Sequence, residues 1–128
     1  MPMKEVWVVD DDEEMAKAVS LMLQLLDYTA KHFLNPRLAA QALLAGKQPD
    51  LLILDINMPE VSGLDMLEFI RRRPEWKHLP IIMLSSEATD VTVEKAMQMG
   101  ADAYTMKPVT IEELEKAMSQ AFYKSLKI

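Results

Sequence analysis

The sequence has no cysteine, no apolar run of membrane-spanning length and no excess of basic residues. Without cysteine the chain cannot form a disulfide framework, a thiolate metal site or a cysteine nucleophile. A membrane-spanning helix needs about 18 consecutive apolar residues, and no stretch of the sequence is that long. The 20 Asp and Glu residues outnumber the 14 Lys and Arg residues, and the resulting net charge of −6 argues against a nucleic-acid-binding surface.

Half of the 128 residues are apolar and 27% are charged. This composition is typical of a soluble globular protein, and the length predicts a single domain over residues 1–128. The N-terminal apolar run is short and acidic residues follow it, so it does not have the pattern of a signal peptide. Together with the lack of cysteine, this favours a cytoplasmic location.

Five short apolar runs divide the chain, and each predicts a β-strand. They lie at residues 6–9, 29–33, 51–54, 81–84 and 103–106. Three of them are continuous runs of four apolar residues, a pattern typical of strands that are buried on both faces of a parallel sheet.

Helical patterns lie between these runs. They cover residues 13–26, 63–72 and 90–99, a segment from Asn35-Pro36 to Gly46, and a segment that runs from Thr110 to about Lys124. Thr110 and Glu113 form a capping-box pattern that marks the start of the last helix. Strict alternation of strands and helices predicts an α/β fold, in which right-handed crossovers build a parallel sheet covered by helices.

Polar residues follow four of the five predicted strands. Asp10-Asp11-Asp12 follows the first, Asp55 the third, Ser85-Ser86 the fourth and Lys107-Pro108 the fifth. The second strand ends in Phe33-Leu34, which offers no reactive group. Open α/β sheets bind ligands at the carboxyl ends of their strands, so we expect the functional site at this edge.

The aspartates at this edge predict a divalent-cation site. If the first and third strands are neighbours, Asp10, Asp11 and Asp55 converge, and two unit charges 4 Å apart repel by about 4 kcal/mol at an effective dielectric of 20. Lys107 supplies one compensating charge, and a hard divalent cation would supply two more. Oxygen ligands of this kind favour Mg²⁺, for which Mn²⁺ or Ca²⁺ can substitute.

A carboxylate can also attack phosphorus and form an aspartyl-phosphate. Such a transfer mainly needs in-line positioning and neutralisation of the phosphoryl oxygens. Asp55, which ends the most apolar strand, is the candidate nucleophile. Lys107 and the Ser85 hydroxyl are suited to binding the phosphoryl oxygens.

Four motifs occur in order along the chain: Val8-Val9-Asp10-Asp11, Leu52-Ile53-Leu54-Asp55-Ile56-Asn57-Met58-Pro59, Met83-Leu84-Ser85 and Lys107-Pro108. Taken together they resemble the response-regulator receiver domain of two-component signalling, a family that includes chemotaxis regulators. The resemblance covers the whole chain. It implies a flavodoxin-like, doubly wound (βα)5 fold with five parallel strands in the order 2-1-3-4-5.

The resemblance also implies roles for the motif residues. Asp55 would be the phosphoacceptor, and Lys107 would bind a phosphoryl oxygen. Asp10 and Asp11 would bind Mg²⁺, and Asn57 would contribute its backbone carbonyl to the metal.

Further implied roles concern signalling. Ser85 would move toward the attached phosphoryl group, and Tyr104 would turn inward with it as an aromatic switch. Asn57 and Glu87 occupy positions that tune the phosphoryl lifetime in the family. The Lys107–Pro108 peptide bond, with its tertiary amide at Pro108, is commonly cis.

The implied function is phosphoryl acceptance from a histidine kinase or a histidine phosphotransfer protein. Phosphorylation would then change binding of a downstream protein at the face of the fourth helix, fifth strand and fifth helix. The domain would catalyse only its own phosphorylation and dephosphorylation, without an effector domain in this chain, as a monomer or a weak homodimer. Leu21 and Leu25, off the apolar stripe of the first helix, are candidates for docking the histidine-bearing helix.

Three alternatives make different demands on the sequence. A degenerate receiver that binds partners without phosphorylation would be expected to lack Asp55 or Lys107. A Mg²⁺-dependent phosphatase would need a second acid where Asn57 stands, and a flavin mononucleotide carrier would need a hydroxyl-rich loop in place of the three aspartates. His32, in the second strand, and His78, in a loop, are interpreted as structural residues away from the acids.

Overall fold

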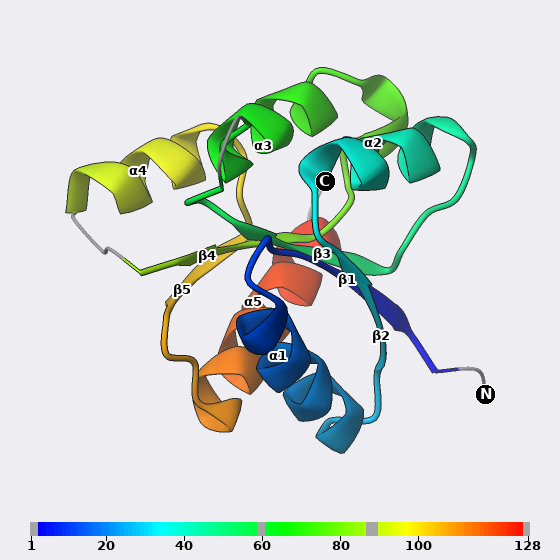
Figure 1. The fold of residues 1–128 in the computed structure, drawn as a ribbon. Coiled ribbons are helices and arrows are strands. Elements are labelled where there is room, and N and C mark those ends of the chain that lie inside the picture. The colour runs from blue at the N-terminus through cyan, green and yellow to red at the C-terminus, as the bar shows by residue number, and fades with distance from the viewer. Residues whose placement is uncertain (1–2, 59–60, 87–89, 127–128) are drawn as a thin grey trace.

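The computed structural model describes residues 3–58, 61–86 and 90–126. In chain order the elements are β1 (Glu5–Val9), α1 (Glu13–Leu25), β2 (Thr29–Phe33), α2 (Pro36–Leu44), β3 (Leu51–Asp55), α3 (Gly63–Arg71), the 3₁₀ turn η1 (Pro74–Trp76), β4 (Ile81–Ser85), α4 (Asp90–Gln98), β5 (Ala103–Met106) and α5 (Ile111–Leu126). The strands form one parallel sheet in the order β2-β1-β3-β4-β5. This confirms the predicted fold class and strand order (Figure 1).

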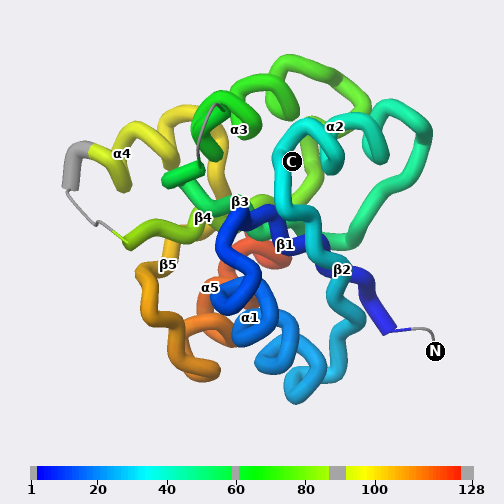
Figure 2. The backbone as a smooth tube through the Cα atoms, viewed as in Figure 1, coloured from blue at the N-terminus to red at the C-terminus, as the bar shows by residue number. Residues whose placement is uncertain are grey.

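Helices cover both faces of the sheet. Helices α1 and α5 lie on one face, and α2, α3 and α4 lie on the other (Figures 1 and 2). Successive strand side chains point to opposite faces, so Val6 and Val8 of β1 pack with α1 and α5, whereas Trp7 and Val9 join the other cluster. Because both faces of the central strands are buried, β1, β3 and β4 are largely continuous apolar runs, whereas the edge strand β2 alternates between more and less exposed residues.

Side chains at the helix starts satisfy backbone N–H groups that have no partner within the helix. The Asp12 side chain accepts from the N–H groups of Glu14 and Met15 at the start of α1. Asn35 caps α2, and Ser62 forms a capping box at the start of α3. At the start of α5, Thr110 Oγ1 accepts the N–H of Glu113 at 3.2 Å. These caps confirm most of the predicted helix starts and place each helix directly after the strand-end loop that precedes it.

The strand order sets where a site can form. Strands β1 and β3 are neighbours, and the connection after β1 leads to β2 on one side of this pair, whereas the connection after β3 leads to β4 on the other side. Such a switch in strand order opens a crevice at the carboxyl ends of the strands. Within the described ranges, no helix is both long and apolar enough to cross a membrane.

Candidate functional site: a carboxylate cluster at the strand ends

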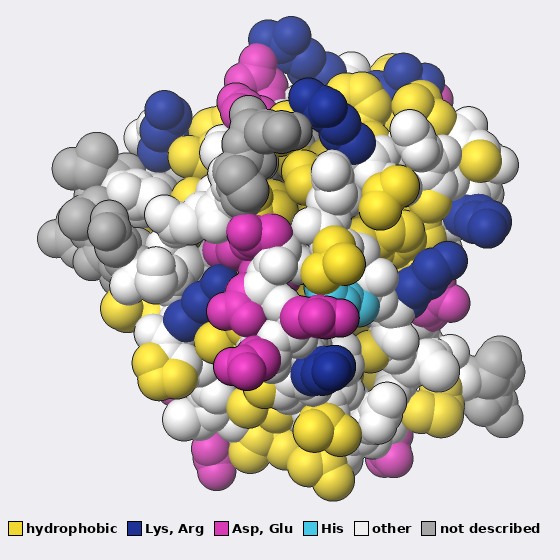
Figure 3. All heavy atoms as spheres, in the orientation of Figure 1, with side chains coloured by type: hydrophobic (Ala, Val, Ile, Leu, Met, Phe, Trp, Pro, Cys, Tyr) yellow, Lys and Arg dark blue, Asp and Glu magenta, His cyan; other side chains and the backbone are white. Residues whose placement is uncertain are grey.

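The carboxyl ends of β1, β3 and β5 bring Asp10, Asp55 and Lys107 together. Asp10 directly follows β1, Asp55 is the last residue of β3, and Lys107 directly follows β5. The Lys107 Nζ atom lies 3.2 Å from Asp10 Oδ2 and 3.2 Å from Asp55 Oδ2. Figure 3 shows acidic side chains gathered on this face of the molecule. The structure thus brings together Asp10 and Asp55, which the sequence predicts to converge with Asp11, and places the Lys107 ammonium beside both.

Asp10 is fully buried and is held from several directions. Its N–H donates to the carbonyl of Phe33 at 3.1 Å, and its Oδ1 accepts the N–H of Asp12 at 2.9 Å. Its Oδ2, although close to Lys107, makes no hydrogen bond of good geometry with any residue in the described part of the chain. A buried carboxylate oxygen without such a bond has unused capacity to bind a cation.

Asp55 is also buried, with 1% of its surface exposed. Its Oδ1 accepts the N–H of Asn57 at 3.1 Å, which leaves Oδ2 directed at Lys107. The pKa of Asp55 is raised to about 6, first by burial and next by the nearby Asp10 charge, while Lys107 and the Asn57 N–H act in the opposite direction. At neutral pH Asp55 is therefore mainly an ionised carboxylate in a site that disfavours unneutralised negative charge.

Lys107 is positioned by the backbone around it. Its N–H donates to the carbonyl of Ser85 at 2.8 Å, which ties the end of β5 to the end of β4. The peptide bond between Lys107 and Pro108 is cis, the isomer that the resemblance implies. Burial acts to lower the pKa of Lys107, but Asp55 and Asp10 outweigh this effect, so the pKa is raised. Lys107 thus remains a cation beside the two carboxylates.

The acidic cluster fits a divalent cation. Carboxylate oxygens of Asp10, Asp11 and Asp55 lie within 4.8 Å of one another, with Asp11 exposed and the other two buried. The three carboxylates outnumber the Lys107 ammonium beside them, so the cluster carries excess negative charge. Its oxygen ligands are those of hard cations such as Mg²⁺, Mn²⁺ and Ca²⁺.

Ser85 and Asn57 face each other beside Asp55. Ser85 is buried, and its Oγ donates to Asn57 Oδ1 at 3.4 Å. The Asn57 side chain is therefore directed at the hydroxyl predicted to act as a switch. Tyr104 is half-buried on β5, in a groove of about 410 Å³ that it shares with Val93 of α4 and Ala117 of α5. Glu87, predicted to tune the phosphoryl lifetime, lies outside the described residues.

His32 corrects the sequence interpretation. It was expected to lie away from the acids, but its Nε2 atom is 2.8 Å from the backbone oxygen of Asp10. Strand β2 pairs directly with β1, with His32 opposite Val8 and Phe33 opposite Val9. The end of β2 therefore flanks the acidic loop. The implied strand order already places β2 beside β1, but the contact of His32 with Asp10 depends on the register of the two strands.

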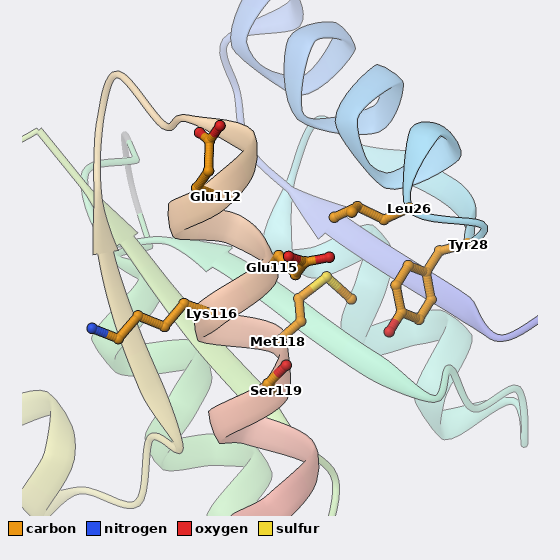
Figure 4. Close-up of a pocket in the computed structure, with 7 residues that line it drawn as sticks. All are labelled: Leu26, Tyr28, Glu112, Glu115, Lys116, Met118 and Ser119. Atoms are coloured by element: carbon orange, nitrogen blue, oxygen red, sulfur yellow. The ribbon is translucent and has the colours of Figure 1, made fainter.

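A separate groove of about 430 Å³ lies between the end of α1 and α5. Figure 4 shows the residues that line it: Leu26, Tyr28, Glu112, Glu115, Lys116, Met118 and Ser119. Burial and the Glu115 charge raise the pKa of Tyr28, so its hydroxyl stays protonated. Because this lining shares no residue with the carboxylate cluster, the groove is not part of that site.

Comparison with known proteins identifies the family. Residues 6–119 match the response regulator receiver domain. The chain belongs to this family. It is 31% identical over 118 residues to the chemotaxis protein CheY-3 of Vibrio cholerae, an alignment that covers 92% of this chain and 91% of CheY-3. The solved structure of Vibrio cholerae CheY4 superposes with a TM-score of 0.84 at 29% identity, covering 94% of this chain and 99% of that one.

Receiver domains also occur within longer proteins. The chain is 30% identical over 110 residues to the protein RcaC of Microchaete diplosiphon, an alignment that covers 86% of this chain and 17% of RcaC. The protein described here is thus a receiver domain of two-component signalling. Proteins of this family signal through histidine kinases and downstream targets and are not metabolic enzymes. The Asp10, Asp11 and Asp55 cluster is compatible with the divalent metal expected of such a domain.

Proposed function

We propose that this receiver domain accepts a phosphoryl group on Asp55 from a phosphohistidine of a histidine kinase or a histidine phosphotransfer protein. The observation that carries this proposal is the position of Asp55 Oδ2, 3.2 Å from the Lys107 ammonium at the edge where the strands end. The other carboxylate oxygen of Asp55, Oδ1, accepts the N–H of Asn57. Oδ2 is therefore the oxygen best placed to attack.

The transfer exchanges one bond to phosphorus for another. Asp55 Oδ2 forms the new O–P bond while the P–N bond to the donor imidazole breaks, and the leaving imidazole nitrogen takes a proton from solvent. Lys107 moves from pairing with the carboxylate to pairing with a phosphoryl oxygen, so its charge is retained in the product. The reaction needs positioning and charge neutralisation more than covalent help from the protein, and in this sense the domain assists its own phosphorylation.

Mg²⁺ is the proposed cofactor, with Mn²⁺ or Ca²⁺ as substitutes. Asp10, Asp11 and the backbone carbonyl of Asn57 would hold it beside Asp55. When bound, the ion supplies positive charge to the phosphoryl oxygens. The buried Asp10 Oδ2, which makes no well-formed hydrogen bond within the described ranges, supports this assignment.

The proposed switch runs from Ser85 to Tyr104. In the present structure the Ser85 hydroxyl donates to Asn57, and a phosphoryl group on Asp55 offers it a stronger, charged acceptor. Movement of Ser85 would leave space for the half-buried Tyr104 to turn inward. The result would be a population shift at the α4-β5-α5 face, where Met106 and Tyr123 are exposed.

Docking of the donor is proposed at α1. Leu21 and Leu25 are 61% and 74% exposed, one helical turn apart, which suits contact with a helix that carries the donor histidine. We further propose that residues 1–128 act as one domain in the cytoplasm, as a monomer or a weak phosphorylation-dependent homodimer. Asn57 and Glu87 would set the lifetime of the phosphoryl group.

The direct test of this function is phosphorylation of the purified chain by acetyl phosphate. Intact mass spectrometry should show addition of one phosphoryl group in the presence of Mg²⁺ and loss of the reaction when EDTA removes the metal. Incorporation at the same rate with EDTA would contradict the metal assignment. Absence of incorporation under both conditions would favour a receiver that binds partners without phosphorylation.

A further inference from the structure

His32 is held against the backbone of the acidic loop. Its Nε2 lies 2.8 Å from the Asp10 carbonyl oxygen, and because a carbonyl oxygen can only accept, the Nε2–H group is the donor. At the next residue of β2, the Phe33 carbonyl accepts the N–H of Asp10 at 3.1 Å. Two consecutive residues of β2 therefore hold both backbone polar groups of Asp10.

The carbonyl that His32 binds belongs to the peptide group between Asp10 and Asp11. This group is planar from the Cα of Asp10 to the Cα of Asp11. A hydrogen bond to its oxygen therefore restricts rotation of the plane and fixes the direction in which the Asp11 side chain leaves the backbone. Asp11 is the exposed member of the cluster, and its carboxylate lies within 4.8 Å of those of Asp10 and Asp55.

We propose that His32 is a positioning residue for the divalent-cation site. Its N–H donor fixes the Asp10–Asp11 peptide, so that the Asp11 carboxylate faces the cluster before a cation binds and less conformational entropy is lost on binding. This inference rests on the proposed function, because it concerns the same metal site. It adds to that site a residue of β2, the strand at whose end Phe33-Leu34 offers no reactive group.

Two substitutions at His32 separate the effect of the N–H donor from the effect of the ring. Glutamine places an amide N–H the same number of bonds from Cβ as histidine Nε2, whereas phenylalanine fills the space of the ring without a donor. His32 is half-buried beside a groove of about 300 Å³ lined by residues of α1, which leaves room for either side chain. The backbone bond from Asp10 to Phe33 remains in both variants.

The test is titration of the metal-free full chain with MgCl₂ by isothermal titration calorimetry. Partners that orient metal ligands typically contribute roughly 10–100-fold to metal affinity, so His32→Phe should raise the Mg²⁺ dissociation constant about tenfold. His32→Gln should stay within about threefold of wild type. His78→Gln, at an exposed histidine of the loop after η1, is the matched control and should bind Mg²⁺ as wild type does.

A second readout separates positioning from a general loss of structure. In acetyl phosphate phosphorylation, His32→Phe should raise the Mg²⁺ concentration needed for half-maximal rate and leave the rate at saturating Mg²⁺ near wild type. Urea unfolding without metal, at the temperature of the titration, checks that every variant is folded. His32→Leu repeats the removal of the donor with a smaller side chain. Unchanged Mg²⁺ affinity in His32→Phe, or equal losses in His32→Phe and His32→Gln, would overturn the proposal. Failure of wild type to bind Mg²⁺ would instead refute the metal site itself.

Discussion

The Lys107 ammonium lies 3.2 Å from Oδ2 of Asp55, and both groups are withdrawn from solvent, with 15% and 1% of their side chains exposed. At this distance and burial the attraction between them is not screened as it would be at the surface. The same ammonium therefore serves two states of the site: Lys107 stabilises an otherwise unfavourable carboxylate at rest, and it is in place to neutralise a phosphoryl oxygen.

Substitution of Lys107 should impair phosphorylation more than it impairs folding. Lys107→Met removes the cation that faces the phosphoryl oxygens, and loss of one such stabilising group typically slows a reaction by about 100-fold. The rate is measured with acetyl phosphate at saturating Mg²⁺. The control is Lys77→Met, which removes a lysine from the exposed end of η1. A Lys107→Met rate within a few-fold of wild type would remove Lys107 from the proposed chemistry.

Metal-free stability should depend on pH through Asp55. Its pKa is raised to about 6 in the folded chain by burial first and by the Asp10 charge next, while its unfolded value is about 3.9. The folded state therefore holds this proton more tightly. The contribution of Asp55 protonation to the free energy of unfolding is fully present below about pH 4 and is lost as pH rises through about 6.

Asp55→Asn removes this titration. In urea unfolding with EDTA, the variant should gain stability relative to wild type as pH rises from 4 to 7, by about 1–3 kcal/mol. Groups that titrate in both proteins cancel in the difference. A difference that is constant over this range would show that Asp55 titrates alike in the folded and unfolded chain.

Gly63 tests how closely α3 packs on the phosphoacceptor. A Cβ at this position would lie 2.1 Å from the Asp55 backbone oxygen, a distance that only movement of the backbone can relieve. Gly63→Ala should therefore lower the free energy of unfolding by about 3 kcal/mol and also slow phosphorylation.

Gly46 provides the control for this substitution. It has a φ of +93° but no atom within 4 Å of an added Cβ, so Gly46→Ala should cost only about 1 kcal/mol and leave phosphorylation unchanged. Equal effects of the two substitutions on phosphorylation would contradict the close-packing argument.

Asp102 links the amino ends of β4 and β5, at the edge of the sheet opposite the carboxylate cluster. Its Oδ2 accepts from the Ile81 N–H at 2.8 Å and from Arg71 at 2.9 Å, and Arg71 also donates to the carbonyls of Gly100 and Trp76. Asp102→Ala leaves the Ile81 N–H and the Nη2 group of Arg71 without this acceptor and should cost about 3 kcal/mol in urea unfolding.

An exposed ion pair gives the comparison. Glu68 and Arg72 pair across one turn of α3 with 47% and 77% of their side chains exposed, so Glu68→Ala should cost less than about 0.5 kcal/mol. Phosphorylation should be unaffected by either change. Similar costs for Asp102→Ala and Glu68→Ala would show that burial does not strengthen the Arg71–Asp102 interaction.

Much of the fold could be predicted because short local patterns in the sequence indicate individual strands and helix starts. The continuous apolar run before Asp55 requires a strand that is buried on both faces, and Thr110 with Glu113 marks a helix start whichever way the helix packs. The first helix was predicted to end at Leu26, but it ends at Leu25 because Leu26 is its C-cap and Asp27 adopts a φ of +69°. Ends of helices depend on such local geometry, which composition does not specify.

The site was predictable where residues follow strands and was missed where it depends on register. Asp10, Asp55 and Lys107 converge because parallel strands end at one edge, which the topology alone requires. The contact of His32 with the Asp10 backbone depends on the alignment of β2 against β1. The direction of the Asn57 side chain toward Ser85 likewise depends on the loop after β3. Neither could be derived from residue spacing.

We propose Asp55 as the phosphoacceptor. The most direct measurement is intact mass spectrometry of wild type, Asp55→Asn and the exposed control Asp65→Asn after incubation with acetyl phosphate and Mg²⁺. We predict addition of one phosphoryl group to wild type and to Asp65→Asn, and none to Asp55→Asn. Incorporation retained in Asp55→Asn would show that another residue is the phosphoacceptor.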